Sequence, residues 1–96
     1  MRFLSLAMHY PKPEHVDDLL GAMKRLGGAL HTAPSLLEAT AWQDHASGRI
    51  VAISTWESSQ AFFNARPVIG EAIKDVPFDE WEAKPRELFI ATIIGL

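Results

Sequence analysis

The sequence predicts a single α+β domain of the ferredoxin-like class, in which an antiparallel sheet carries helices on one face. Three observations support this prediction. The chain has 96 residues, 48% of them hydrophobic, which suits one hydrophobic core. Its apolar residues alternate between a strand period of two and a helical spacing. The resulting order is strand, helix, strand, strand, helix, strand, the split βαβ or βαββαβ unit. We therefore treat residues 1–96 as one domain.

The chain begins with a predicted strand and then a strongly patterned helix. Residues 2–10, RFLSLAMHY, alternate with a period of two, which is typical of a strand whose two faces differ. Apolar side chains then recur at helical spacing from Val16 to Leu26, with acidic residues early and basic residues late. We expect this helix to end at Gly27 and Gly28.

The middle of the chain predicts a β-hairpin. The segments LLEATAWQD and RIVAISTW have the residue pattern of strands, and the short connection HASG joins them. Gly48 is available for the positive φ angle that such a connection needs.

The last third of the chain predicts a helix, an irregular stretch and a strand. Ser58 can cap a helix over 59–75, and Pro67 must kink or divide this helix because it lacks an N–H. We expect PFDEWEAKP, residues 77–85, to be irregular and residues 86–96 to form an apolar final strand.

Composition and charge exclude several classes of function. A net charge of -3 without a run of Lys and Arg predicts no binding to nucleic acid or to an anionic membrane. No apolar stretch reaches the roughly 20 residues of a membrane span, and the first residues lack a signal-peptide pattern, so we expect a cytoplasmic protein. The chain has no Cys, no metal-spaced His cluster and no phosphate-binding glycine pattern. We therefore expect no metal, flavin or haem cofactor.

Both faces of the predicted sheet carry apolar residues. If Leu4, Leu6 and Met8 pack against the helices, the opposite face has less charge than a solvent-facing sheet would have. We expect a homodimer in which two sheets pack face to face and enclose a cavity for a small apolar or aromatic ligand. The residues expected on the enclosed face are Phe3, Ser5, Ala7, His9, Leu36, Glu38, Thr40, Trp42, Ile50, Ala52, Ser54 and Trp56, together with Leu88, Ile90, Thr92 and Ile94 or the alternate residues of the last strand.

One part of the sequence resembles a known family. The segment SGRIVAISTWESSQAFFNAR, preceded by SLLEATAWQD, is similar to the antibiotic biosynthesis monooxygenase superfamily, and the local match covers residues 35–70. The resemblance implies ferredoxin-like subunits that pair as a dimeric α+β barrel. The superfamily includes cofactor-free quinone-forming oxygenases, haem-degrading enzymes and proteins of no known activity, so the resemblance implies the fold more strongly than the reaction.

The chain departs from this superfamily at several positions. Many members carry a His nine residues after the strand-end Trp56, where this chain has Ala65. The pocket Asn and Tyr of a quinone-forming member correspond to Ala52 and Phe62. The first-strand Asn, the helix Trp and the helix His of haem-degrading relatives are also unmatched. The resemblance therefore implies that haem is not a substrate.

Four residues are candidates for catalysis. His9 is the candidate general base because a histidine imidazole titrates near neutral pH, and the alternative is a structurally hydrogen-bonded or solvated His. Trp56 either plugs the core or contacts the ligand. Asn64 and Arg66 are, with Trp42 and Trp56, candidate donors to a substrate anion, and the alternative for Arg66 is a surface or interface charge.

Further residues are candidates for substrate contact. Glu38 is either a charge at the sheet edge or a buried carboxylate that could serve as a base. Residues 75–85 are either a packed loop, fastened by Phe78 and Trp81, or a lid. The candidate substrate-binding residues are Ser5, Glu38, Trp42, Ser54, Phe62 and Phe63.

These features favour a cofactor-independent monooxygenase that acts on a small aromatic or enolic compound. The reaction needs a dry apolar cavity, one base and one or two donors for the resulting anion, which itself reduces dioxygen. A non-catalytic dimeric module that binds a small hydrophobic ligand is the first alternative, and the lost polar groups at Ala52, Phe62 and Ala65 favour it. An isomerase or lyase that uses the same base without oxygen is the second.

Overall fold

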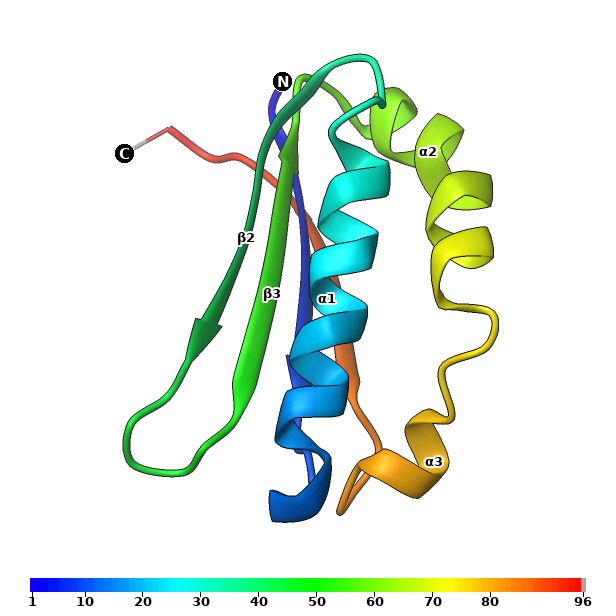
Figure 1. Ribbon diagram of the computed structural model, residues 1–96. Helices are drawn as coiled ribbons and strands as arrows, with labels where there is room; N and C mark the ends of the chain where they lie inside the picture. The colour runs from blue at the N-terminus through cyan, green and yellow to red at the C-terminus, as the bar shows by residue number, and fades with distance from the viewer. Residues whose placement is uncertain (96) are drawn as a thin grey trace.

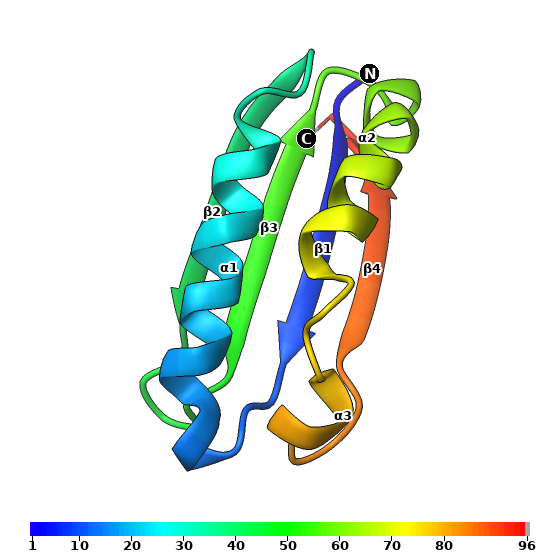
Figure 2. The ribbon, with the colours of Figure 1, turned by 45° about the vertical axis from the view of Figure 1, so that its right-hand side comes forward.

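The computed structural model describes residues 1–95 and shows a four-stranded antiparallel sheet with its helices on one face (Figure 1). The strands are β1 (Phe3–His9), β2 (Leu36–Gln43), β3 (Ile50–Trp56) and β4 (Glu87–Thr92), in the order β2-β3-β1-β4. The helices are η1 (Pro13–His15), α1 (Val16–Leu30), α2 (Ser59–Ile73) and α3 (Phe78–Trp81). The predicted ferredoxin-like order is confirmed, and in Figure 2 α1 and α2 lie in front of the sheet.

The hairpin between β2 and β3 forms as the sequence predicts. Gly48 has a φ of 76°, the left-handed conformation expected of it. The Asp44 carboxylate accepts hydrogen bonds from the Ser47 hydroxyl, the Ala46 N–H and the Arg49 guanidinium. These hydrogen bonds, of which the one from Ser47 has the largest effect, lower the pKa of Asp44 to about 2.

Several boundaries differ from the prediction. The final strand, expected over 86–96, spans Glu87–Thr92, so Ile94 is not part of a strand, and residue 96 lies outside the described residues. The first helix continues through Gly27 and Gly28 to Leu30, because neither glycine adopts the positive φ that ends a helix and Leu30 packs into the core. The segment 77–85 is not wholly irregular, because α3 forms after Pro77, with Asp79 and Glu80 in its first turn.

The second helix begins where the sequence predicts. Ser58 caps α2, its hydroxyl oxygen accepting the Ala61 N–H at 3.2 Å. Pro67 lies inside α2 without dividing it, on an exposed part of the helix where water can satisfy the carbonyl that loses its partner. Within residues 1–95 no helix is both long and apolar enough to cross a membrane.

The predicted assignment of the sheet faces is wrong. Phe3 and His9 are buried against the helices, whereas Leu4, Leu6 and Met8 lie on the face without helices, which we call the outer face. Alternation separates two faces but does not say which one the helices cover. The strand registers place Phe3, Ser5, Ala7, His9, Ile50, Ala52, Ser54, Trp56, Leu88, Ile90 and Thr92 on the helix-covered face.

A bulge in β2 causes a second error. The register shifts between Leu36 and Glu38, so Leu36 pairs with Trp56 but Glu38 pairs with Thr55. A bulge adds one residue to a strand and thereby reverses the alternation that follows it. Glu38, Thr40 and Trp42 consequently lie on the outer face and not beside His9, whereas Ala39, Ala41 and Gln43 share the helix-covered face.

The hydrophobic core consists of two clusters at opposite ends of the sheet. At one end Trp56, the largest fully buried side chain, packs with its neighbours, and at the other end Leu19 and Ile50 are fully buried. The residues of the first cluster are Phe3, Leu30, Trp56, Phe62 and Ala65. Those of the second are Leu19, Ala22, Met23 and Ile50.

Candidate functional site

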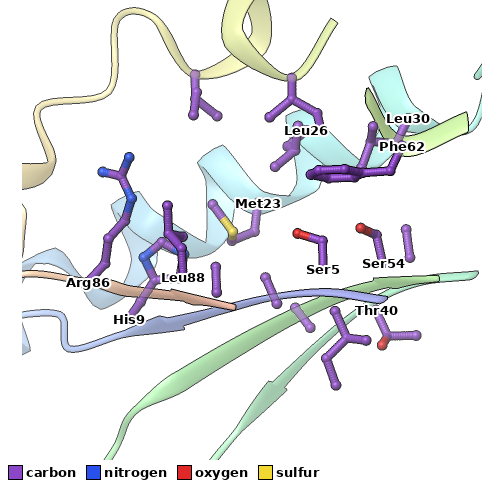
Figure 3. A pocket seen from close by; sticks show the side chains of 18 of the residues that line it. Ser5, His9, Met23, Leu26, Leu30, Thr40, Ser54, Phe62, Arg86 and Leu88 are labelled. Atoms are coloured by element: carbon purple, nitrogen blue, oxygen red, sulfur yellow. The ribbon is translucent and has the colours of Figure 1, made fainter. Parts of the chain in front are cut away.

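A cavity of about 980 Å³ lies between the two core clusters, under α1 and α2. Its floor is the middle of the helix-covered face, where β1 and β3 present Ser5, Ala7, Ala52 and Ser54. These short side chains leave space that the helices above do not fill. Figure 3 shows Ser5 and Ser54 on the sheet beneath Phe62, and Thr40 on the other side of the sheet.

A buried histidine on the wall of this cavity is paired with a buried carboxylate that lies behind it. His9 ends β1, lines the cavity and is 3% exposed. Its Nδ1 lies 3.1 Å from Oε2 of Glu82, whose Oε1 accepts the Tyr10 N–H at 2.9 Å. Because an ionised carboxylate only accepts hydrogen bonds, the contact suits the tautomer with hydrogen on Nδ1. That tautomer leaves Nε2 with a lone pair that can take a proton.

The segment around α3 positions Glu82. Glu82 forms an isolated antiparallel bridge with Pro11, next to the end of β1. The Lys12 N–H donates to the Trp81 carbonyl and the Ala83 N–H donates to the Tyr10 carbonyl, each at 2.8 Å. These backbone hydrogen bonds hold the carboxylate beside His9.

Aromatic rings pack this segment against the start of the chain. The Phe78 ring stacks on the His9 imidazole, with 5.7 Å between the centroids. The Trp81 ring stacks on His15 at 6.0 Å. Of the two interpretations of residues 75–85, the contacts of Phe78 and Trp81 correspond to the packed one.

Trp56 is a core residue that reaches the cavity through a neighbour. Its side chain is fully buried and meets Phe62 edge-on at 6.0 Å. The indole Nε1–H donates to the Ser54 hydroxyl oxygen at 2.9 Å. Because that oxygen accepts from Trp56, the hydroxyl hydrogen of Ser54 is free to donate toward the cavity.

The structure brings six of the predicted site residues together and leaves four outside the cavity. Trp56 lies behind Ser54, and Asn64 is exposed on α2, its side-chain carbonyl accepting from Gln60 at 2.8 Å. Glu38 and Trp42 lie on the outer face because of the β2 bulge. The six that line the cavity are Ser5, His9, Ser54, Phe62, Phe63 and Arg66.

Sequence reasoning missed Glu82 and Arg86. Glu82 is 73 positions from His9, and no local pattern joins residues so far apart. Arg86 directly precedes β4 and lines the cavity, its Cζ atom 3.9 Å from the centroid of the Phe78 ring. The available signal was a cluster of aromatic and acidic residues, FDEWE, shortly before the final strand.

The arrangement is suited to proton transfer in an apolar cavity. A base whose second nitrogen is held by a carboxylate keeps one orientation and one tautomer. The hydroxyls of Ser5 and Ser54 lie on the cavity floor, where they can donate to an anion. In residues 1–95 we find no group of three or more His, Asp or Glu side chains that could hold a metal ion.

Comparison with solved structures confirms the fold, whereas no family model and no curated protein matches the chain. The protein Rv0793 from Mycobacterium tuberculosis has a TM-score of 0.85 at 12% identity, covering 100% of this chain and 98% of its own. A structure described as an antibiotic biosynthesis monooxygenase has a TM-score of 0.78 at 17% identity, with coverages of 97% and 99%. A variant of SnoaB, a cofactor-independent oxygenase from Streptomyces nogalater, has a TM-score of 0.81 at 13% identity, with coverages of 99% and 95%.

Proposed function

We propose that this chain, which has the fold of the antibiotic biosynthesis monooxygenase structures, is a cofactor-independent monooxygenase for a small aromatic or enolic compound. The observation that carries the proposal is that His9 lines an apolar cavity and is paired with the buried carboxylate of Glu82. A carboxylate-held imidazole is a suitable base, and the small residues on the cavity floor leave room for a substrate ring. The likeness to a cofactor-independent oxygenase supports the same reaction class.

The proposed reaction begins with removal of a proton by His9. Nε2 takes the proton from a phenol or enol, and the Glu82 carboxylate stabilises the resulting imidazolium. The Ser54 and Ser5 hydroxyls donate to the substrate anion. Trp56 acts only through Ser54, whose oxygen its indole N–H holds.

Dioxygen is the oxidant in the steps that follow. The substrate anion gives one electron to dioxygen, and the two radicals then combine at an activated ring carbon to form a peroxide. The imidazolium of His9 returns a proton to this peroxide, which loses water to leave a carbonyl. A CH₂ group and O₂ thus become a C=O group and H₂O, with all four electrons supplied by the substrate.

Oxygen uptake with anthrone and naphthohydroquinone as probes tests the proposal. We expect the unmutated protein to consume oxygen and His9→Gln to reduce turnover on the order of 100-fold, because a positioned base is lost. His45→Gln makes the same chemical change on the exposed hairpin and should retain full activity. Full activity of His9→Gln, or no uptake with either probe, would contradict the proposal.

Glu82 is proposed as a positioning residue, and its variant separates orientation from binding. We expect Glu82→Gln to lower kcat by about tenfold while leaving KM unchanged, since Glu82 is hidden behind His9 and does not reach the cavity. A decrease in kcat and an increase in KM by the same factor, together with a lower melting temperature, would indicate a purely structural role.

A non-catalytic ligand-binding module is the second candidate function. Ala52, Phe62 and Ala65 lack the polar groups that the superfamily pattern places there, and this observation favours binding without reaction. Saturable binding of the two probes without any product would support it. Product formed equally well without oxygen would instead indicate an isomerase or lyase.

The proposed assembly is a homodimer formed through the outer face. Aliphatic side chains of β1 and β3 cover this face, and Trp42 and Phe89 are 61% and 52% exposed there in the single chain. Two copies packed through whole sheets would bury more than the roughly 1,600 Å² of a standard interface. The outer-face residues are Leu4, Leu6, Met8, Glu38, Thr40, Trp42, Val51, Ile53, Thr55, Glu87, Phe89 and Ala91.

A further inference from the structure

The charges around the cavity point to the substrate class. We infer that the substrate is an aromatic hydroxy acid, whose carboxylate is held by Arg86 while its hydroxyl faces His9. This inference rests on the proposed function in placing the substrate in the same cavity, and it adds an ionic anchor that the reaction itself does not require.

The charged residues that line the cavity are all cations. The chain is acidic overall, with 12 Asp and Glu against 9 Lys and Arg. Nevertheless Lys24, Arg66 and Arg86 line the cavity, and among the described residues no Asp or Glu does. Glu82 lies near the cavity but is turned to His9 and Tyr10, and only 3% of its side chain is exposed. An apolar cavity with this charge distribution favours an anion.

Arg86 is the cation with the most defined position. Its guanidinium carbon lies 3.9 Å from the centroid of the Phe78 ring, a cation–π contact that restrains the side chain. Within residues 1–95 it forms no ion pair within 4.0 Å and no hydrogen bond. Asp79 and Glu80 share a shallow surface hollow with it but do not pair with it at that distance. The N–H donors of Arg86 are therefore unused by the protein.

An arginine held in this way suits a carboxylate. The planar guanidinium presents parallel N–H groups that match the two oxygens of a carboxylate, a fit that lysine lacks. Lys24 and Arg66 are exposed, and Arg66 lies 5.9 Å from the ring of the exposed Phe63. Those two cations suit attraction of an anion toward the cavity more than its orientation.

Phe78 connects the proposed anchor to the proposed base. Its ring stacks with the His9 imidazole and also lies against the Arg86 guanidinium. Figure 3 shows His9, Leu88 and Arg86 together at one end of the cavity. A carboxylate bound to Arg86 would thus place the neighbouring ring hydroxyl at the end where His9 lies, with the apolar rings extending beneath α1 and α2.

Calorimetric binding of a matched probe pair tests the inference. The probes are 1-hydroxy-2-naphthoate and its methyl ester, which differ chiefly in the negative charge. We expect the unmutated protein to bind the acid at least about tenfold more tightly than the ester, the scale of a charge-assisted hydrogen bond. Arg86→Gln should remove this preference by weakening the acid alone. Arg25→Gln, the same charge change at an exposed α1 position that does not line the cavity, should keep it.

The outcomes separate the inference from the proposed function. Equal binding of acid and ester by the unmutated protein, or binding of neither, would overturn the inference, as would a preference that survives in Arg86→Gln. Should Arg86→Gln fail to fold, Arg86→Lys keeps the charge but loses the planar fork, and an undiminished preference there would also overturn it. Arg86-dependent acid binding without oxygen uptake would refute only the oxygenase reaction. Oxygen uptake with the ester as fast as with the acid would refute only the anchor.

Discussion

The two faces of the sheet differ in a way that is unusual for a domain made of one sheet and one layer of helices. The middle of the helix-covered face carries small side chains, among them Ser5 and Ala52, and a cavity lies above them. The outer face carries bulky aliphatic side chains, such as Leu6 and Ile53, with no layer over them. A monomer stabilised by its own core would be expected to have the reverse distribution.

Helices can therefore cover a sheet face without side chains filling the space above it. The helices pack on the two core clusters at the ends of the sheet, so the middle of the helix-covered face can remain open for a ligand. The uncovered face has the composition of a buried one, which is why a second copy is its proposed cover.

Truncation of the buried Trp56 side chain, at one end of the cavity, should have the largest effect on stability. We expect Trp56→Ala to lower the free energy of unfolding by about 3–5 kcal/mol, because a fully buried aromatic side chain leaves a void. Trp42→Ala removes the same side chain from the outer face, where it is 61% exposed in the single chain, and should cost less than about half as much at protein concentrations where the chain is monomeric. Urea unfolding measures both, and equal losses would contradict the contrast between the faces.

A charge at the centre of the outer face should prevent the proposed assembly. Leu6 pairs with Ile53 in the two central strands, so Leu6→Asp would bury an unpaired carboxylate between two sheets. We expect dimerisation to weaken on the order of 100-fold, as measured by sedimentation. Thr32→Asp adds the same charge at an exposed turn and is the control. An unmutated protein that sediments as a folded monomer at micromolar concentration would rule out this assembly.

Two glycines in the helices above the cavity should make the protein slightly less stable than alanine at the same positions would. Gly27 and Gly70 line the cavity, and a methyl group added at either would meet nothing within 4 Å. We expect each Gly→Ala change to raise the free energy of unfolding by about 0.5–1 kcal/mol. Gly48→Ala should instead lower it, because the φ of Gly48 is 76°. Thermal unfolding distinguishes the two signs, and a loss at Gly70 would show that its wall is already filled.

The smallest effect belongs to the hairpin that connects strands β2 and β3. The Asp44 carboxyl should titrate at a pH of about 2, because Ser47, Ala46 and Arg49 donate hydrogen bonds to its charged form. Its folded pKa lies below the unfolded value, so its contribution to stability is present above the unfolded pKa and disappears as the pH falls through about 2. Carbon-detected NMR titration measures the midpoint, and Ser47→Ala should raise it. A midpoint at the ordinary carboxyl value would contradict the contacts.

Local patterns in the sequence were sufficient to predict the order of the elements and several of their ends. Apolar spacing predicted the strands and helices, Ser58 predicted the start of α2, and Gly48 predicted the turn. Each of these features depends on residues a few positions apart, so a local pattern contains the required information. His9 was also recognised, because its place in a strand and its chemistry are both visible locally.

Which face of the sheet the helices cover, and which residues meet at the cavity, depend on how the elements pack together. The bulge before Glu38 reverses the alternation of β2, and the spacing of apolar residues in the sequence does not predict it. Glu82 reaches His9 only because α3 is hydrogen-bonded to the end of β1, and Arg86 reaches Phe78 only where β4 begins. Such contacts depend on how whole elements pack, since the free energy of packing depends on side chains that are distant in sequence.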